Sequence, residues 1–248
     1  MNVLVLNPNT SADVTDLLVA AGRAVAAPGT ELVSATAAYG VPYIATRAEA
    51  QIGGAIALEM LAERHADVDA AIVAAFGDPG LLGARELFDI PVVGLAEAAM
   101  LTACMLGRRF AIVTFAGALG PWYEDCVAMH GLADRCAGVR ALDGPFRALS
   151  SVQGEKEGLL VDLALRAIEE DGADVIILGG APLAGLAPRV ADRVPVPLVD
   201  PIAAAVKQAE ALVALSPRKA TAGTFRRPAA KTTTGLPDAL ARRIEHRD

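Results

Sequence analysis

The chain has 248 residues, and 54% of them are hydrophobic, so it can bury the core of one large domain or of two small ones. Lysine and arginine number 22 against 29 aspartates and glutamates, and the net charge of −7 repels nucleic-acid phosphates and anionic lipid surfaces. We therefore expect neither nucleic acid nor a membrane as a partner.

The N-terminus carries no predicted export signal. Its apolar run, Val3–Leu6, stops at Asn7 and is too short for a signal peptide or a membrane span, so the predicted location is cytoplasmic. The three cysteines (Cys104, Cys126 and Cys136) show no C-x-x-C spacing. We expect reduced thiols and no metal site.

Short apolar runs alternate with helical stretches along the chain, which is typical of βα units on a parallel sheet. The predicted strands are Asn2–Leu6, Glu31–Thr36, Ala70–Ala75, Pro91–Gly94, Phe110–Phe115, Val139–Leu142, Asp174–Leu178 and Val196–Val199. The predicted helices are Ser11–Ala26, Ala48–His65, Leu81–Leu87, Ala96–Leu106, Pro121–His130, Val152–Asp171, Leu183–Asp192 and Ile202–Leu215. After Leu215 a tail with a short helix over Ala239–His246 is either frayed or an arm over the first half or a neighbouring subunit.

The order of these elements contains an internal repeat. Three pairs of segments resemble each other at separations of 105 to 107 residues: Ile90–Gly94 with Val196–Asp200, Ala75–Leu81 with Gly180–Leu186, and Leu6–Asn9 with Val113–Ala116. An eight-stranded barrel also fits the element count, but the common separation favours duplication. We therefore predict an α/β fold of two pseudo-symmetric halves, 1–95 with 202–248 and 96–201. Each half is a parallel sheet flanked by helices, and the ligand pocket lies between them.

Ligands of open parallel sheets bind beyond the carboxyl ends of the strands, so the residues there are the candidate site. Asp78 is read either as a cap of the next helix along the chain or as a base, and Glu97 either as a partner of the helix dipole or as a catalytic group. Tyr39 is a candidate ligand-binding residue at the same edge. The histidines (His65, His130 and His246) fall at predicted helix ends or in the tail, in sequence typical of solvated surface, and none is predicted to be a base.

Several of these segments together resemble the aspartate/glutamate/hydantoin racemase family, closest to the hydantoin and allantoin racemases. The residues that carry the resemblance are Asn7–Ser11, Phe76–Leu81, Gly94–Met100, Leu178–Ala181 and the tail Lys231–Leu236. The resemblance implies a cofactor-independent racemase that acts on a small molecule and forms a homo-oligomer. It also implies two-base catalysis, in which one cysteine removes the α-proton and another returns a proton on the opposite face.

Carried over to this chain, the two cysteine positions are Ala75 and Gly180, so both expected thiols are missing. Three functions stay open: proton transfer at the α-carbon of a hydantoin, allantoin or diketopiperazine by Asp78, Glu97 or a tyrosine; decarboxylation or hydrolysis; and ligand binding without catalysis. The residues expected around the substrate are Asn7, Asn9, Tyr43, Ala75, Phe76, Gly77, Thr114, Gly180, Ala181 and Pro182.

Overall fold

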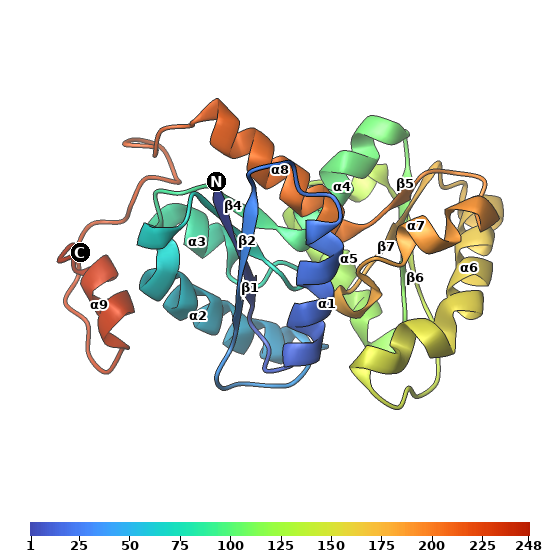
Figure 1. Cartoon of the computed structure of the whole chain (residues 1–248), viewed down its shortest axis with the longest axis horizontal. Coiled ribbons are helices and arrows are strands. Elements are labelled where there is room, and N and C mark those ends of the chain that lie inside the picture. The colour runs from blue at the N-terminus through green and yellow to red at the C-terminus, as the bar shows by residue number, and fades with distance from the viewer.

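The computed structural model describes residues 1–248 apart from the side chain of Ser150. It contains two four-stranded parallel sheets that lie side by side (Figure 1). The strands of the first sheet, in the spatial order β2-β1-β3-β4, are β1 (Asn2–Asn7), β2 (Glu31–Thr36), β3 (Ala70–Val73) and β4 (Val92–Gly94). Those of the second, in the order β6-β5-β7-β8, are β5 (Phe110–Thr114), β6 (Cys136–Ala141), β7 (Val175–Leu178) and β8 (Leu198–Val199).

The two sheets have the same topology, which confirms the predicted fold class of two similar α/β halves. The central strands β1, β3, β5 and β7 are continuous apolar runs because helices cover both of their faces. The edge strand β6 is partly exposed along its whole length.

The helices fill the connections between the strands. Their bounds are α1 (Ala12–Arg23), α2 (Arg47–Arg64), α3 (Leu81–Leu87), α4 (Leu95–Leu106), α5 (Gly120–Met129), α6 (Val152–Asp171), α7 (Ala187–Val190), α8 (Pro201–Leu215) and α9 (Asp238–Ile244). Short 3₁₀ turns occupy His65–Asp67, Gly117–Leu119, Ala133–Arg135, Leu149–Ser151, Ala181–Leu183 and Ala191–Arg193. No helix of the described residues is both long and apolar enough to cross a membrane.

Two helices join the halves by packing on the opposite sheet. Helix α4 follows the first sheet but packs against β5, β7 and β8, whereas α8 follows the second sheet and packs against β3 and β4. The two helices also pack on each other, and Gln208 of α8 donates hydrogen bonds to the Ala98 carbonyl and the Thr102 hydroxyl of α4. One hydrophobic core therefore runs through both halves.

The C-terminal segment is an arm over the first half and not a frayed tail. Helix α9 packs on α2 (Figure 1). Leu240 of this helix is buried in the core of the first half. The guanidinium of Arg243 is buried, donates to the Leu87 carbonyl at 2.8 Å and lies over the Phe88 ring. These contacts fix the arm in place.

The predicted helix Leu183–Asp192 is the clearest error among the predicted elements. Only Ala187–Val190 is α-helical, and 3₁₀ turns flank it. Pro182 and Pro188 lack backbone donors, and Gly185 takes a left-handed φ of +78°, so a continuous helix is interrupted. Strand β6 also begins three residues before the predicted start at Val139.

Candidate active site

A small cavity lies where the carboxyl ends of the strands of the two halves face each other. The space there that no atom fills, including space open to solvent, is about 330 Å³. It is lined by Asn9, Val14, Tyr43, Ile44, Ala75, Phe76, Trp122, Tyr123, Leu149, Gly180, Ala181 and Pro182. None of these described side chains carries a formal charge at neutral pH, so the cavity suits an uncharged ligand.

Aromatic rings form most of the wall. Phe76 and Tyr123 lie 4.7 Å apart between ring centroids, and Tyr43 lies 5.8 Å from Phe115. The Tyr43 hydroxyl is buried and has no hydrogen-bond partner among the described residues. A buried polar atom without a partner is costly, so this hydroxyl is suited to bind a ligand atom.

Both cavity tyrosines are held in the protonated form. Burial raises the pKa of Tyr43 above the usual phenol range, and the nearby Glu49 carboxylate adds to the effect. Burial likewise raises the pKa of Tyr123 well above its usual value. At neutral pH these groups are hydrogen-bond donors and weak acids, and not ready-made bases.

The two asparagines at and just after the end of β1 have different roles. The Asn7 amide donates to the Asn9 side chain, the Ser11 carbonyl and the Thr15 hydroxyl, so it orders the turn before α1 and does not line the cavity. Asn9 lines the cavity, and its Oδ1 accepts from the Ser11 amide at 2.9 Å. Asn9 is therefore the amide of this pair that can contact a ligand.

Asp78 lies outside the cavity, in the turn after β3. Its two carboxylate oxygens accept the backbone amides of Ala96 and Glu97, both at 2.8 Å, so it caps α4. The prediction of a cap thus fits, although the helix is α4 and not the next one along the chain. The Gly94 position leaves room for this carboxylate, because a Cβ there would lie 2.5 Å from Asp78 Oδ2.

His130 completes a buried ionic cluster with Asp78 and Glu97. Its Nε2 lies 3.0 Å from Asp78 Oδ2, and its Nδ1 lies 3.4 Å from Glu97 Oε1. Burial alone would lower the pKa of His130, but the hydrogen bonds to the two carboxylates outweigh burial and raise the pKa to about 9. The expectation of a solvated His130 is therefore wrong, since its side chain is only 5% exposed.

Glu97 also pairs with Arg85 of α3, whose Nη1 lies 2.8 Å from Glu97 Oε1. Burial alone would raise the pKa of Glu97, but the hydrogen bonds to His130 and Arg85 lower it to about 2. Glu97 does not line the cavity. Both predicted carboxylate bases are thus placed in an ion network beside the cavity.

Comparison with known proteins matches residues 3–209 to the family model described as Asp/Glu/Hydantoin racemase. The chain belongs to the Asp/Glu/hydantoin racemase family. It is 33% identical to the hydantoin racemase of Paenarthrobacter aurescens over 93% of this chain and 99% of that one. The solved allantoin racemase of Klebsiella pneumoniae is 38% identical, with a TM-score of 0.90 over 97% of this chain and 98% of that one. By family, therefore, this protein is an isomerase of the racemase type.

A more distant likeness concerns the fold alone. A solved arylmalonate decarboxylase is 18% identical, with a TM-score of 0.58 over 86% of this chain and 92% of that one. The two-sheet architecture therefore extends beyond the racemases.

The two family cysteine positions differ from each other in this racemase-family chain. Ala75 bears a Cβ and lines the cavity. Gly180 has a φ of +123°, and a Cβ there would lie 2.8 Å from the Phe115 ring and 3.5 Å from the Tyr123 hydroxyl oxygen. Phe115 and Tyr123 thus fill space that a side chain at position 180 would need.

The other predicted ligand-contacting residues lie outside the cavity wall. Gly77 faces Trp122 and lines a separate groove, Thr114 is buried with its hydroxyl unpartnered among described residues, and Tyr39 is exposed and hydrogen-bonded to Glu59. Trp122 and Tyr123 of the cavity wall were not predicted from the sequence, because they lie on α5 and not at a strand end. Their rarity was the one available signal, because the chain has only one tryptophan and three tyrosines and places two of these four residues side by side at 122 and 123.

Proposed function

We propose that this protein binds a small uncharged cyclic amide or ureide, of the hydantoin, allantoin or diketopiperazine type, between Ala75 and Gly180 and moves its α-proton without thiols. The observation that carries the proposal is the cavity itself, which lies between the two halves and has Ala75 and Gly180 in its wall. Its lining has no charged side chain to pair with the carboxylate or ammonium of a free amino acid. Burying an unpaired charge there would cost free energy, and an uncharged ring avoids that cost.

The unpartnered Tyr43 hydroxyl is the group best suited to activate such a ring. A phenol that donates to the ring carbonyl stabilises the negative charge which develops on that oxygen as the α-carbon loses its proton. The C–H electron pair then becomes the C=C bond of the enolate, and the proton passes to hydroxide or water in the cavity.

Reprotonation on the opposite face yields the other enantiomer. Tyr123 lies beside Gly180, so its hydroxyl is placed to donate a proton on that face and to recover one from water. We assign Asp78 and Glu97 to holding the turn and α4, since neither lines the cavity and both are engaged in other bonds.

Ligand binding without turnover is the second candidate. It is favoured by one observation: no cavity-lining side chain ionises readily near neutral pH. Decarboxylation is less well supported, because no lysine or arginine lines the cavity to bind a substrate carboxylate.

Exchange of the α-proton in heavy water, followed by proton NMR across a panel of hydantoins, allantoin and diketopiperazines, tests the proposal. We expect loss of the α-proton signal with the unaltered protein and a rate roughly ten- to a hundredfold lower for Tyr43→Phe. Tyr39→Phe is the matched control, since Tyr39 lies on the same loop but is exposed. Binding without exchange would support the second candidate, and an absence of both would overturn each of them.

A further inference from the structure

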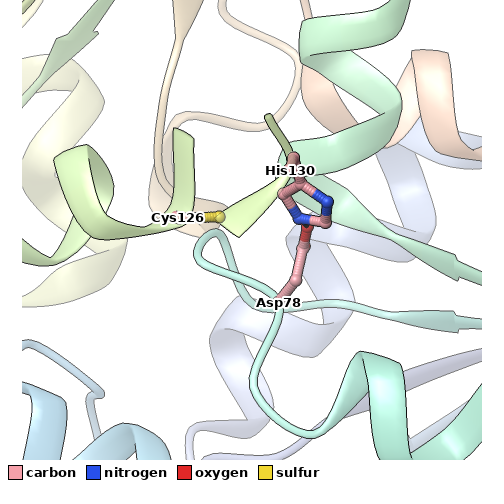
Figure 2. Close-up of side chains that lie close together, drawn as sticks. All are labelled: Asp78, Cys126 and His130. Carbon is pink, nitrogen blue, oxygen red and sulfur yellow. Dashed lines mark hydrogen bonds and ion pairs between the residues drawn. The ribbon is translucent and has the colours of Figure 1, made fainter. Parts of the chain in front are cut away.

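We propose that Asp78, Cys126 and His130 form a binding site for one divalent transition-metal ion, best zinc, at the junction of the two halves. Figure 2 shows the three side chains converging from two elements: Asp78 from the turn after β3, and Cys126 and His130 from α5 and its C-terminal cap. One ligand atom from each residue lies within 4.8 Å of the others. None of the three lines the cavity between Ala75 and Gly180, so this site is separate from the proposed active site.

The backbone directs all three groups to one point. Cys126 and His130 are four residues apart, so they lie one turn apart on the same face of α5. Asp78 adopts a left-handed φ of +53°, which is uncommon for a residue other than glycine. This conformation directs its carboxylate toward α5, and Asp78 Oδ2 lies 3.0 Å from His130 Nε2.

The surroundings resemble the outer shell of a metal site. Metal-bound histidines usually donate their second ring nitrogen to a carboxylate, which fixes the tautomer and the ring orientation. His130 Nδ1 lies 3.4 Å from Glu97 Oε1, and Arg85 holds Glu97 in turn. The Asp78 carboxylate is oriented by two backbone amides.

Sulfur, imidazole and carboxylate donors together favour zinc over magnesium or calcium, which prefer oxygen ligands. Donor atoms around a tetrahedral zinc ion lie roughly 3.3 to 3.6 Å apart. The widest pair in this cluster therefore has to close by about 1 Å, which is within the reach of side-chain rotation. A groove lined by Gly77, Asp78 and Cys126 gives access for the ion and for a water in the fourth position.

Such an ion would connect the two halves, because its ligands come from both. Asp78 belongs to the first half, whereas Cys126 and His130 belong to the second, and Asp78 follows Ala75 by only three residues. A bound ion would hold the turn that carries Ala75 against α5. An ion that binds only the folded state raises thermal stability, and by more the further its free concentration exceeds its dissociation constant.

Cobalt binding tests the proposal, because cobalt coordinated by a thiolate absorbs in the near ultraviolet and cobalt bound by nitrogen and oxygen alone does not. The full chain is freed of metal with a chelator and titrated with Co²⁺, and Zn²⁺ is then added. We expect one cobalt per chain, the thiolate band, its loss on adding zinc, and a higher melting temperature with either metal.

Three variants test two of the ion's ligands and the Glu97 carboxylate behind His130. Cys126→Ser should abolish the band, His130→Asn should weaken cobalt binding by at least about tenfold, and Glu97→Gln should weaken it roughly ten- to a hundredfold. Cys104→Ser, which alters a half-buried thiol outside the cluster, should change nothing. If Cys126→Ser fails to fold, His130→Asn still tests the site, and unchanged cobalt binding by that variant overturns the proposal. A missing band with the unaltered protein, or a band that survives the substitution of Cys126 or is lost with that of Cys104, overturns the proposal.

Discussion

The two loops that face the cavity differ in how they are held, although the halves share one topology. In the first half the turn 75–80 is held by charge, because Asp78 caps α4 and pairs with His130. In the second half the loop 180–185 carries no charged side chain, and neutral groups hold most of it: Gln153 donates to the Pro182 and Ala184 carbonyls.

A carboxylate links loop and helix in both halves, but from opposite sides. Asp78 lies in the first loop and reaches the helix that follows β4. Asp200 lies at the start of the helix that follows β8, and its Oδ2 accepts the Gly185 amide of the loop. The repeat matches Asp200 with Gly94, where a side chain would collide with Asp78. Both halves thus have a carboxylate that links loop and helix, but it lies on the loop in the first half and on the helix in the second.

The largest expected effect comes from removing charge in the first loop. Asp78→Asn removes the anionic partner of both amides, turns a donor toward one of them and leaves His130 facing only Glu97, so we expect a loss of roughly 3 to 5 kcal/mol in the free energy of unfolding. Urea denaturation measures it. Asp125→Asn, which alters an exposed ion pair with Arg47, is the control and should have no measurable effect. Equal losses of stability in Asp78→Asn and Asp125→Asn would contradict the claim that charge holds the first loop.

The next largest effect is expected from placing a cysteine at each of the two family positions, because the loss of stability should differ between the two halves. Gly180→Cys puts a side chain on a backbone with φ +123° and against Phe115, so we expect a loss of roughly 2 to 4 kcal/mol. Ala75→Cys adds one atom to an existing Cβ and should cost less than about 1.5 kcal/mol. Thermal melts of the two variants provide the measurement. Equal stability would show that the second loop adapts more easily than its geometry implies.

Loosening the second loop should have a moderate effect. Gln153→Ala leaves two carbonyls without their donor, and we expect a loss of about 1 to 2 kcal/mol. Amide hydrogen exchange should accelerate in residues 180–186 and stay unchanged in residues 75–81. Gln51→Ala, on an exposed part of α2, is the control. Faster exchange in both loops would contradict separate anchoring.

The smallest effect, which depends on pH, is expected at Asp200. Burial raises the pKa of this carboxyl despite its backbone hydrogen bonds. A raised pKa in the folded state contributes stability below the unfolded pKa of about 3.9 and loses it as pH rises through the folded value. Asp200→Asn should therefore destabilise by less than about 1 kcal/mol at pH 7, and its stability deficit should shrink from pH 4 to pH 7. A deficit that widens over this range would contradict the raised pKa.

Much of the fold was predictable because its strands are short, apolar and regularly spaced. The repeat at 105 to 107 residues indicated two halves. Ala75 and Gly180, the positions where the family resemblance implies cysteines, both line the cavity. Seven of the ten predicted ligand-contacting residues line the cavity: Asn9, Tyr43, Ala75, Phe76, Gly180, Ala181 and Pro182.

The remaining features depend on contacts between distant segments, which spacing alone does not encode. His130 has the local sequence of a surface residue because its buried partners are distant along the chain: Asp78 is 52 positions away in the other half, and Glu97 is 33 positions away. Asp78 caps α4 rather than α3 because its left-handed backbone turns the side chain away from the next helix. Trp122 and Tyr123 reach the cavity from a helix, where a search of strand ends does not find them.

A crystal structure with a 5-substituted hydantoin bound, at a concentration shown by calorimetry to saturate the protein, tests the central claim most directly. We predict that the ring's α-carbon lies between Ala75 and Gly180 and that one ring carbonyl accepts a hydrogen bond from the Tyr43 hydroxyl. A ligand bound elsewhere, with this cavity left closed, would contradict it.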